Sequence, residues 1–302
     1  MTRHQTDEIR VTVHPGRPAD QGRILGLLDQ ARHQVVGFGP EDLAHLLSSN
    51  HHLFLIADTG ALLWGFMVTS LLAQPPRPHE TGEAWAQLRG CALINGWQVD
   101  NGLQALWEPM RALLRARTLR HVLHLGFADW IVGPLQHVGF HVVDSLVTLE
   151  RGTGIERAGE GQGPAQLRAP YAGEIDDLLA LDTLAFDPPW RLTRSELIGF
   201  MMMGGHFVVA EFHGQVAGYA FSDVHLEVGQ LARLAVHPSM QHQGIGGQLL
   251  SDALAFCRRA GARTFTLNTQ DSNAASRQLY VRHGLRVVGS RVPVMEYRIP
   301  RP

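Results

Sequence analysis

The sequence contains no lysine, because all 26 of its basic residues are arginine. Schiff-base chemistry, pyridoxal phosphate attachment and the phosphate loop of nucleoside triphosphatases all need a lysine amine, so these mechanisms are excluded. Cysteine is nearly absent as well, since Cys91 and Cys257 are the only two. Two distant cysteines predict neither a disulfide framework nor a metal cluster.

Strong charge and long apolar runs are also missing. The formal net charge of -2 gives no general attraction to nucleic acid or to an anionic membrane. No apolar run reaches the roughly 20 residues that a membrane span needs. His137 and His141 flank Gly139, which argues against one helix presenting both to a metal. We therefore expect a cytoplasmic protein without metal, acting on a small ligand or a protein partner as a monomer or homodimer.

The 302 residues suit two domains of about 150 residues each. "LFLIADTGALLWGFMV" (53–68) and "HFVVAEFHGQVAGYAF" (206–221) both predict a strand, a glycine turn and a second strand, almost in register. An internal duplication explains this likeness. The glycine-rich stretch at 151–166 predicts a linker. The expected domains are 1–152 and 167–302, joined by a linker at 153–166.

The second half predicts a regular order of strands and helices. Strands are expected near 166–169, 206–213, 216–224, 230–236, 264–268 and 286–297, and helices near 172–185, 193–202, 244–260 and 273–283.

The stretch "HPSMQHQGIGGQLL" (237–250) places three glycines where a loop becomes a helix. Glycine is unfavourable in a helix, but a bare first turn can hold a phosphate on its unpaired N–H groups. An ordinary glycine-rich turn is the alternative. A dinucleotide-binding fingerprint does not fit, because Leu249 stands where its third glycine would be.

Together, "LAVHPSMQHQGIGGQLL" and the downstream "TLNTQDSNAASRQLYVRHGL" resemble the acetyl-CoA site of the GNAT superfamily of acetyltransferases. The matching positions are Gln241, Gly244 and Gly246 in the first motif, and Asn273, Tyr280 and Gly284 in the second. The resemblance covers residues 167–298. It implies a mixed α/β fold of two tandem domains, each a mostly antiparallel central sheet flanked by helices, with splayed strands that hold acetyl-CoA.

The resemblance also implies the site residues. Tyr280 would protonate the departing thiolate, although a core tyrosine is the alternative, and the N–H of Val236 would face the thioester carbonyl. Asn273 is expected to cap the following helix. The residues expected to bind acetyl-CoA are Leu234, Ala235, Val236, Gln241, His242, Gln243, Gly244, Ile245, Gly246, Gly247, Asn273, Ser276 and Tyr280.

The general base is less well defined. Many relatives carry a glutamate where this sequence has Gln230, which cannot accept a proton. Glu227 is the candidate base, with Asp223 or a water chain as alternatives, and an exposed Glu227 without a role is also open. "LAFDPPW" (184–190) resembles the front loop of bacterial enzymes that acetylate ribosomal-protein N-termini. Phe186, Trp190 and Gln230 are therefore expected at the acceptor.

The first half departs from the pattern. Asp100 stands near the expected phosphates, where it would repel them, and Leu135 replaces the tyrosine. We expect a degenerate domain there, although a retained cofactor stays open. The chain is predicted to be an acetyl-CoA-dependent N-acetyltransferase, acting on a small-molecule amine or a protein N-terminus by direct attack in a ternary complex. A non-catalytic acetyl-CoA-binding sensor or scaffold is the alternative.

Overall fold

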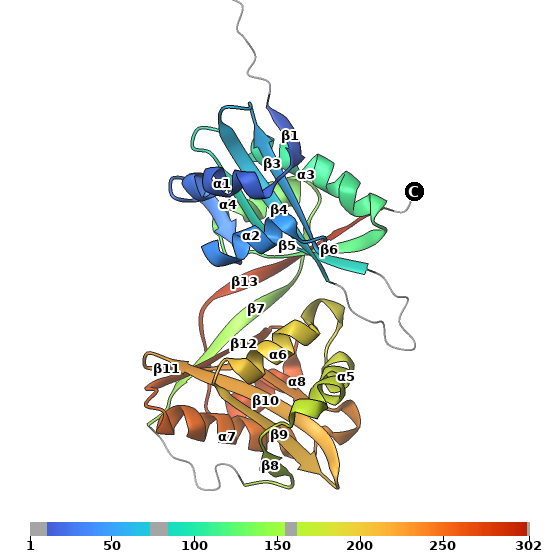
Figure 1. The fold of residues 1–302 in the computed structure, drawn as a ribbon. Coiled ribbons are helices and arrows are strands. Elements are labelled where there is room, and N and C mark those ends of the chain that lie inside the picture. Colours follow the sequence, from blue (N-terminus) through green and yellow to red (C-terminus); the bar gives the residue numbers. More distant parts are fainter. Residues whose placement is uncertain (1–10, 73–83, 155–161, 301–302) are drawn as a thin grey trace, which may run out of the picture. The chain divides into compact units, whose positions relative to one another are not determined.

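A computed structural model describes residues 11–72, 84–154 and 162–300, which group into two compact units (Figure 1). The first unit takes the described residues up to Val143 together with those from Pro293 onward. The second unit takes residues from Asp144 to Val292. Residues 155–161 of the linker expected at 153–166 lie outside the described residues.

The first unit is built on a sheet with the strand order β1-β3-β4-β5-β6-β13, and β2 also pairs with β5. The strands β5 and β6 run parallel, and the other pairs given for this unit are antiparallel. Its elements are β1 (Thr12–Pro15), α1 (Gln21–Leu28), β2 (His33–Val36), α2 (Leu43–Ser48), β3 (His52–Asp58), β4 (Leu63–Leu72), β5 (Ala84–Leu93), α3 (Val99–Ala116), β6 (Leu119–Leu125) and α4 (Asp129–His137).

The second unit has the strand order β7-β12-β11-β10-β9-β8, in which β11 and β12 are the parallel pair. Its elements are β7 (His141–Gly152), β8 (Gln166–Arg168), α5 (Ile175–Ala185), α6 (Arg194–Met202), β9 (His206–Phe212), β10 (Gln215–His225), β11 (Val228–Val236), α7 (Ile245–Arg259), β12 (Thr264–Gln270), α8 (Ala274–Arg282) and β13 (Arg286–Arg298). All the elements predicted for this half are present, with ends that differ by a few residues. The predicted fold class, mixed α/β with mostly antiparallel sheets flanked by helices, is confirmed.

The last strand of each half pairs within the unit formed mainly by the other half. Thr264–Gln270 of β12 pairs with Leu146–Gly152 of β7, although β7 ends the first half of the sequence. Val294–Arg298 of β13 pairs with His121–Leu125 of β6. The two long strands therefore carry the chain between the units.

The sheet of the second unit has a core on each face. Ala220 packs in the cluster that contains Leu249 and Leu254 of α7. Its neighbours Tyr219 and Phe221 pack in the cluster formed with α5 and α6. Because successive strand residues point to opposite faces, α7 covers one face and α5 and α6 cover the other.

The register of the central strands supports an internal duplication. In the first unit Gly65 of β4 opposes Leu93 of β5, and in the second Gly218 of β10 opposes Val236 of β11. Both ladders shift three residues further along, after Val68 and after Phe221. Leu93 and Val236 are therefore equivalent positions.

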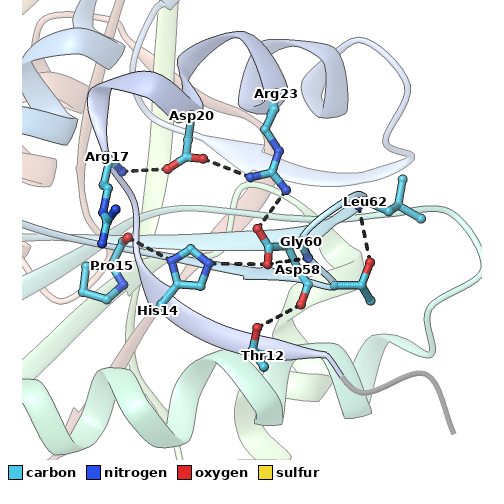
Figure 2. A network of polar contacts seen from close by, with 10 residues as sticks. Thr12, His14, Pro15, Arg17, Asp20, Arg23, Asp58, Gly60 and Leu62 are labelled. Carbon is cyan, nitrogen blue, oxygen red and sulfur yellow. Dashed lines mark hydrogen bonds and ion pairs between the residues drawn. The ribbon is translucent and has the colours of Figure 1, made fainter.

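An ion-pair cluster anchors the first strand of each unit in a similar way. Figure 2 shows Asp58, at the end of β3, between Arg23 of α1 and His14 of β1, at 2.8 Å and 3.4 Å. In the second unit Arg168 of β8 pairs with Glu174 and Glu211. Each cluster joins the first strand, the turn before the first helix and the strand that pairs with the first strand, which is a structural role.

None of the described helices combines the length and the apolarity that a bilayer span requires. Within the described ranges, no group of three or more His, Cys, Asp and Glu side chains is placed to hold a metal ion.

Candidate active site

The two parallel strands of the second unit separate halfway along. Their ladder runs from Val228–Thr264 to Leu231–Leu267, while β11 continues to Val236 and β12 to Gln270. Beyond Leu231, in the part of the chain that the structure describes, β11 has a strand partner only on its β10 side. We call Arg233–Val236 the open edge of β11.

The backbone of the open edge is oriented for pairing. His237 donates its N–H to the carbonyl of Ala217 in β10. Because successive N–H groups of a strand point to opposite sides, the N–H of Val236 points away from β10. The same alternation directs the N–H of Leu234 to the open edge.

The loop after β11 leads directly into the first turn of α7. Gln241 Nε2 donates to the carbonyl of Val236 at 3.2 Å and ties the loop to the end of the strand. Residues 241–244 are exposed, and His242 and Gly244 have positive φ angles of 62° and 86°. Glycine suits the left-handed backbone at 244, where a side chain would be strained.

The first turn of α7 has N–H groups to offer. Gly244 is the N-cap and makes no side-chain capping bond, and the first backbone bond of the helix is that from Gln248 to Gly244. The N–H groups of Ile245, Gly246 and Gly247 therefore resemble the unpaired donors that hold phosphate at helix N-termini.

The glycines of this turn also face α8. A Cβ added at Gly246 would lie 3.4 Å from Leu279, and one at Gly247 would lie 3.4 Å from His283. These are ordinary contact distances. The packing of α7 on α8 therefore does not require glycine at 246 and 247, and their small size is left to suit the approach of a ligand.

Tyr280 of α8 lies in the same core as α7 and is 7% exposed. Burial raises the pKa of its hydroxyl, and a hydrogen bond with Ser276 and the charge of Arg233 oppose this rise. A protonated phenol at neutral pH has a proton to give. Asn273 Oδ1 accepts the N–H of Ser276 at 3.1 Å, which confirms the predicted cap of α8.

The segment Phe186–Leu192, here called the acceptor loop, follows α5 and is held by a buried carboxylate. Asp182 of α5 is fully buried and accepts the N–H of Leu192 at 2.8 Å. Phe186 and Trp190 are half-buried in this loop.

Sequence reasoning missed a polar cluster beneath the acceptor loop. Arg233 of β11 donates to Asp182 through Nε at 2.8 Å and Nη2 at 2.7 Å, and Tyr219 donates to the same carboxylate. The guanidinium carbon lies 3.4 Å from the centre of the Phe186 ring. The available signal was an acid among the apolar positions of α5 together with an arginine within an apolar strand.

The structure does not bring Glu227 or Gln230 to Tyr280. Glu227 lies in the β10–β11 turn and forms an exposed ion pair with Arg263 at 2.9 Å. Val236 is nine residues further on, which corresponds to about 30 Å along a strand. Gln230 is exposed and lies in the paired part of β11, opposite Thr266.

Comparison with known proteins identifies the second half. Residues 175–285 match the model of the acetyltransferase (GNAT) family. A Bacillus subtilis (strain 168) protein assigned as a ribosomal protein bS18-alanine N-acetyltransferase is 26% identical over 129 residues, covering 42% of this chain and 84% of that protein. The ribosomal protein bS18-alanine N-acetyltransferase of Escherichia coli (strain K12) is 35% identical over 68 residues, covering 22% of this chain and less than half, 46%, of the enzyme.

Solved structures match along nearly the whole chain. A tandem GNAT protein from the clavulanic acid biosynthesis pathway has a TM-score of 0.62 at 13% identity, covering 97% of this chain and 100% of the other. A GCN5-related N-acetyltransferase from Sphaerobacter thermophilus has a TM-score of 0.61 at 14% identity, covering 97% and 96%. At such identities the likeness shows the fold alone.

The family match, the matching relatives and the separated strands that lead into a glycine-rich helix start together define an acyltransferase. The chain contains a domain of the acetyltransferase (GNAT) family, and the segment that matches the family model lies in its second half.

Proposed function

We propose that the second unit transfers an acetyl group from acetyl-CoA to a primary amine, with a protein N-terminus as the acceptor. One observation carries the proposal: the open edge of β11 leads, through the short turn Pro238–Met240, into the exposed loop 241–244 and the uncapped start of α7. A strand edge fits an extended pantetheine arm, and the helix start fits a pyrophosphate.

The open edge would also activate the thioester. The Val236 N–H, directed away from β10, would donate to the thioester carbonyl oxygen as negative charge develops there. Holding amine and thioester together replaces a two-body encounter by a positioned one.

Tyr280 would complete the transfer as the acid. The amine nitrogen attacks the carbonyl carbon, the carbon–sulfur bond breaks with its electrons on sulfur, and the Tyr280 hydroxyl protonates the thiolate. The buried hydroxyl keeps its proton at neutral pH, which suits it for this step. The proton lost by the attacking amine passes to water and returns through water to the Tyr280 phenolate, so the transfer releases no net proton. Glu227 takes no part in this proposal.

The acceptor is proposed from two facts. The acceptor loop carries Phe186 and Trp190 beside the buried Asp182. The curated relatives that match this half bear names that describe acetylation of a ribosomal protein alanine. A free N-terminal amine fits both.

A non-catalytic acetyl-CoA-binding module is the second candidate, and the distant placement of Glu227 favours it. Calorimetric titration with acetyl-CoA, followed by measurement of free CoA released in the presence of a peptide with a free N-terminus, separates the two. We expect binding and peptide-dependent release of CoA. Binding without release above the peptide-free background would leave the binding module, and no binding would overturn both.

A further inference from the structure

Arg233 stands where the acceptor loop meets the open edge. It is the first residue of that edge, three positions before Val236. Its side chain is 12% exposed and its partner Asp182 is fully buried. The charge of Arg233 also reaches the hydroxyl of Tyr280, where it opposes the rise in pKa that burial causes.

The guanidinium is held rigidly on two sides. Asp182 accepts from Nε and Nη2 in the two-pronged manner that fixes the plane of an arginine. Phe186 stacks on the guanidinium carbon. A residue fixed in this way makes a further hydrogen bond with little additional loss of conformational freedom.

One nitrogen of the group is left for another partner. The hydrogen bonds of Arg233 in the described chain use Nε and Nη2. None of these bonds uses Nη1, and the Arg233 side chain keeps 12% of its surface exposed, so Nη1 is the nitrogen left to meet a ligand. Its two N–H groups can only donate, so they fit an acceptor such as a carbonyl oxygen and do not fit an ammonium group.

We propose that Arg233 determines the acceptor class by donating from Nη1 to the carbonyl oxygen next to the reacting amine. The acceptor is accordingly an α-amino carbonyl compound, as at a polypeptide N-terminus, rather than a simple alkylamine or a polyamine. Asp182 and Phe186 are positioning residues that act through Arg233. This inference rests on the proposed acetyl transfer and specifies its substrate.

The test uses the full chain and two acceptors, trialanine amide and sec-butylamine, which share a branched carbon beside the amine but differ in the carbonyl. The variant Arg233→Lys keeps a cation beside Asp182 but loses the planar fork. Arg168→Lys is the matched control, since Arg168 is also ion-paired, with Glu174 and Glu211, and lies over the Tyr171 ring at 4.3 Å. Each variant is compared with the wild type on the same acceptor, so that amine basicity cancels.

We expect Arg233→Lys to lower kcat/KM for trialanine amide by about 10- to 100-fold, mainly through KM, as the loss of a charged hydrogen bond predicts. The same change should lower kcat/KM for sec-butylamine less than about threefold. Arg168→Lys should leave the ratio of the two acceptors unchanged. Acetyl-CoA affinity, measured for each variant, should stay within about twofold and reports that the site is folded.

Equal losses on both acceptors, or none on either, with acetyl-CoA binding intact would overturn the role of Arg233 and leave the proposed transfer standing. Failure of the wild type to acetylate any amine would overturn the proposed function and this inference together.

Discussion

In the first unit the edge of β5 from Gly90 to Leu93 pairs with β2, whereas the equivalent edge of β11, from Arg233 to Val236, is open in the described chain. In sequence, β2 lies between the first two helices of its unit, and the acceptor loop lies between the first two helices of the other. One connection thus supplies a strand and the other a loop. If the proposed site of the second unit is correct, β2 occupies the place where a pantetheine arm would pair, and the first unit is predicted to bind no acyl-CoA.

The two units also differ at the start of the helix that follows the central strands and at the position of the proposed acid, Tyr280. Asp100 and Gly246 are both the second residue of their helices, α3 and α7. Asp100 is exposed and pairs with His137 at 2.9 Å. Leu135 of α4, which replaces the tyrosine, is fully buried in the first core. The pairing of β2, Asp100 and Leu135 therefore all favour the prediction that the first unit has a structural role.

The largest effect, on acetyl-CoA affinity, is expected when the first turn of α7 in the second unit is given the aspartate that α3 of the first unit has. Gly246→Asp places a carboxylate among the N–H donors of α7, where it repels a pyrophosphate. We expect acetyl-CoA affinity to fall by about 100-fold or more, measured by calorimetry, with one site per wild-type chain.

Gly246→Asn adds a side chain of the same shape as aspartate but without its charge, so it separates the effect of charge from that of size. This variant should lose far less acetyl-CoA affinity, since a Cβ at 246 lies 3.4 Å from Leu279, an ordinary contact distance. Asp100→Asn in the first unit should change nothing. A second site per chain would contradict the inference that β2 blocks the first unit.

The next effect concerns the acid. Tyr280→Phe copies the apolar residue of the first unit and removes the proton donor, so kcat should fall by about 100-fold or more. Acetyl-CoA affinity should change less than about threefold. Steady-state turnover with a peptide acceptor measures the first quantity and calorimetry the second. Unchanged turnover would leave Tyr280 a core residue, as Leu135 is.

A smaller effect is expected at the edge of β5 that pairs with β2. A Cβ at Gly90 would lie 2.9 Å from the Phe38 ring and 3.2 Å from Val68. Gly90→Val should therefore destabilise the first unit by about 1–3 kcal/mol. Urea unfolding followed by tryptophan fluorescence reports mainly on this unit, because only Trp190 of the six tryptophans is in the other.

Gly133→Ala in α4 is the control, because a Cβ there meets nothing within 4 Å. Acetyl-CoA binding should be the same in both variants. Weaker binding in Gly90→Val alone would show that the first unit contributes to the site.

The sequence could reveal those parts of the site that are close in the chain. Gln241, Gly244 and Gly246 lie on one loop and helix start, and together with the downstream motif their spacing predicts a phosphate site. Asp182 and Arg233 are 51 residues apart and meet only through packing of α5 on the sheet. No local spacing predicts such a pair. The sequence shows only an acid and an arginine, each within an apolar segment.

The same reasoning applies to the general base. Glu227 lies three residues before Gln230, and the strand direction takes it away from Val236, so a role of Glu227 as the base stays a prediction. The first half was expected to be degenerate because of Asp100 and Leu135. The pairing of β2 with β5 was not foreseen, because His33–Val36 is short and has no alternating pattern that shows which edge it joins.

The smallest expected effect comes from the helix caps. α8 begins at Asn273, whose side chain accepts the N–H of Ser276, whereas α4 begins at Ala128, which makes no such bond. Asn273→Ala should cost about 1 kcal/mol of stability in urea unfolding. Ala128→Asn should give a smaller gain, because Ala128 already has the extended backbone of a good cap, with φ -121° and ψ 123°.

A variant that keeps the cap but loses the amide shows whether Asn273 also contacts acetyl-CoA. Asn273→Ser keeps a capping oxygen and should restore most of the lost stability. If acetyl-CoA affinity is restored as well, the asparagine acts only through the helix, and the difference between the two units at this position is one of stability. If stability returns but affinity does not, the amide itself contacts acetyl-CoA. Asn273 would then be one of the residues by which the second unit, which binds acetyl-CoA, differs from the first unit.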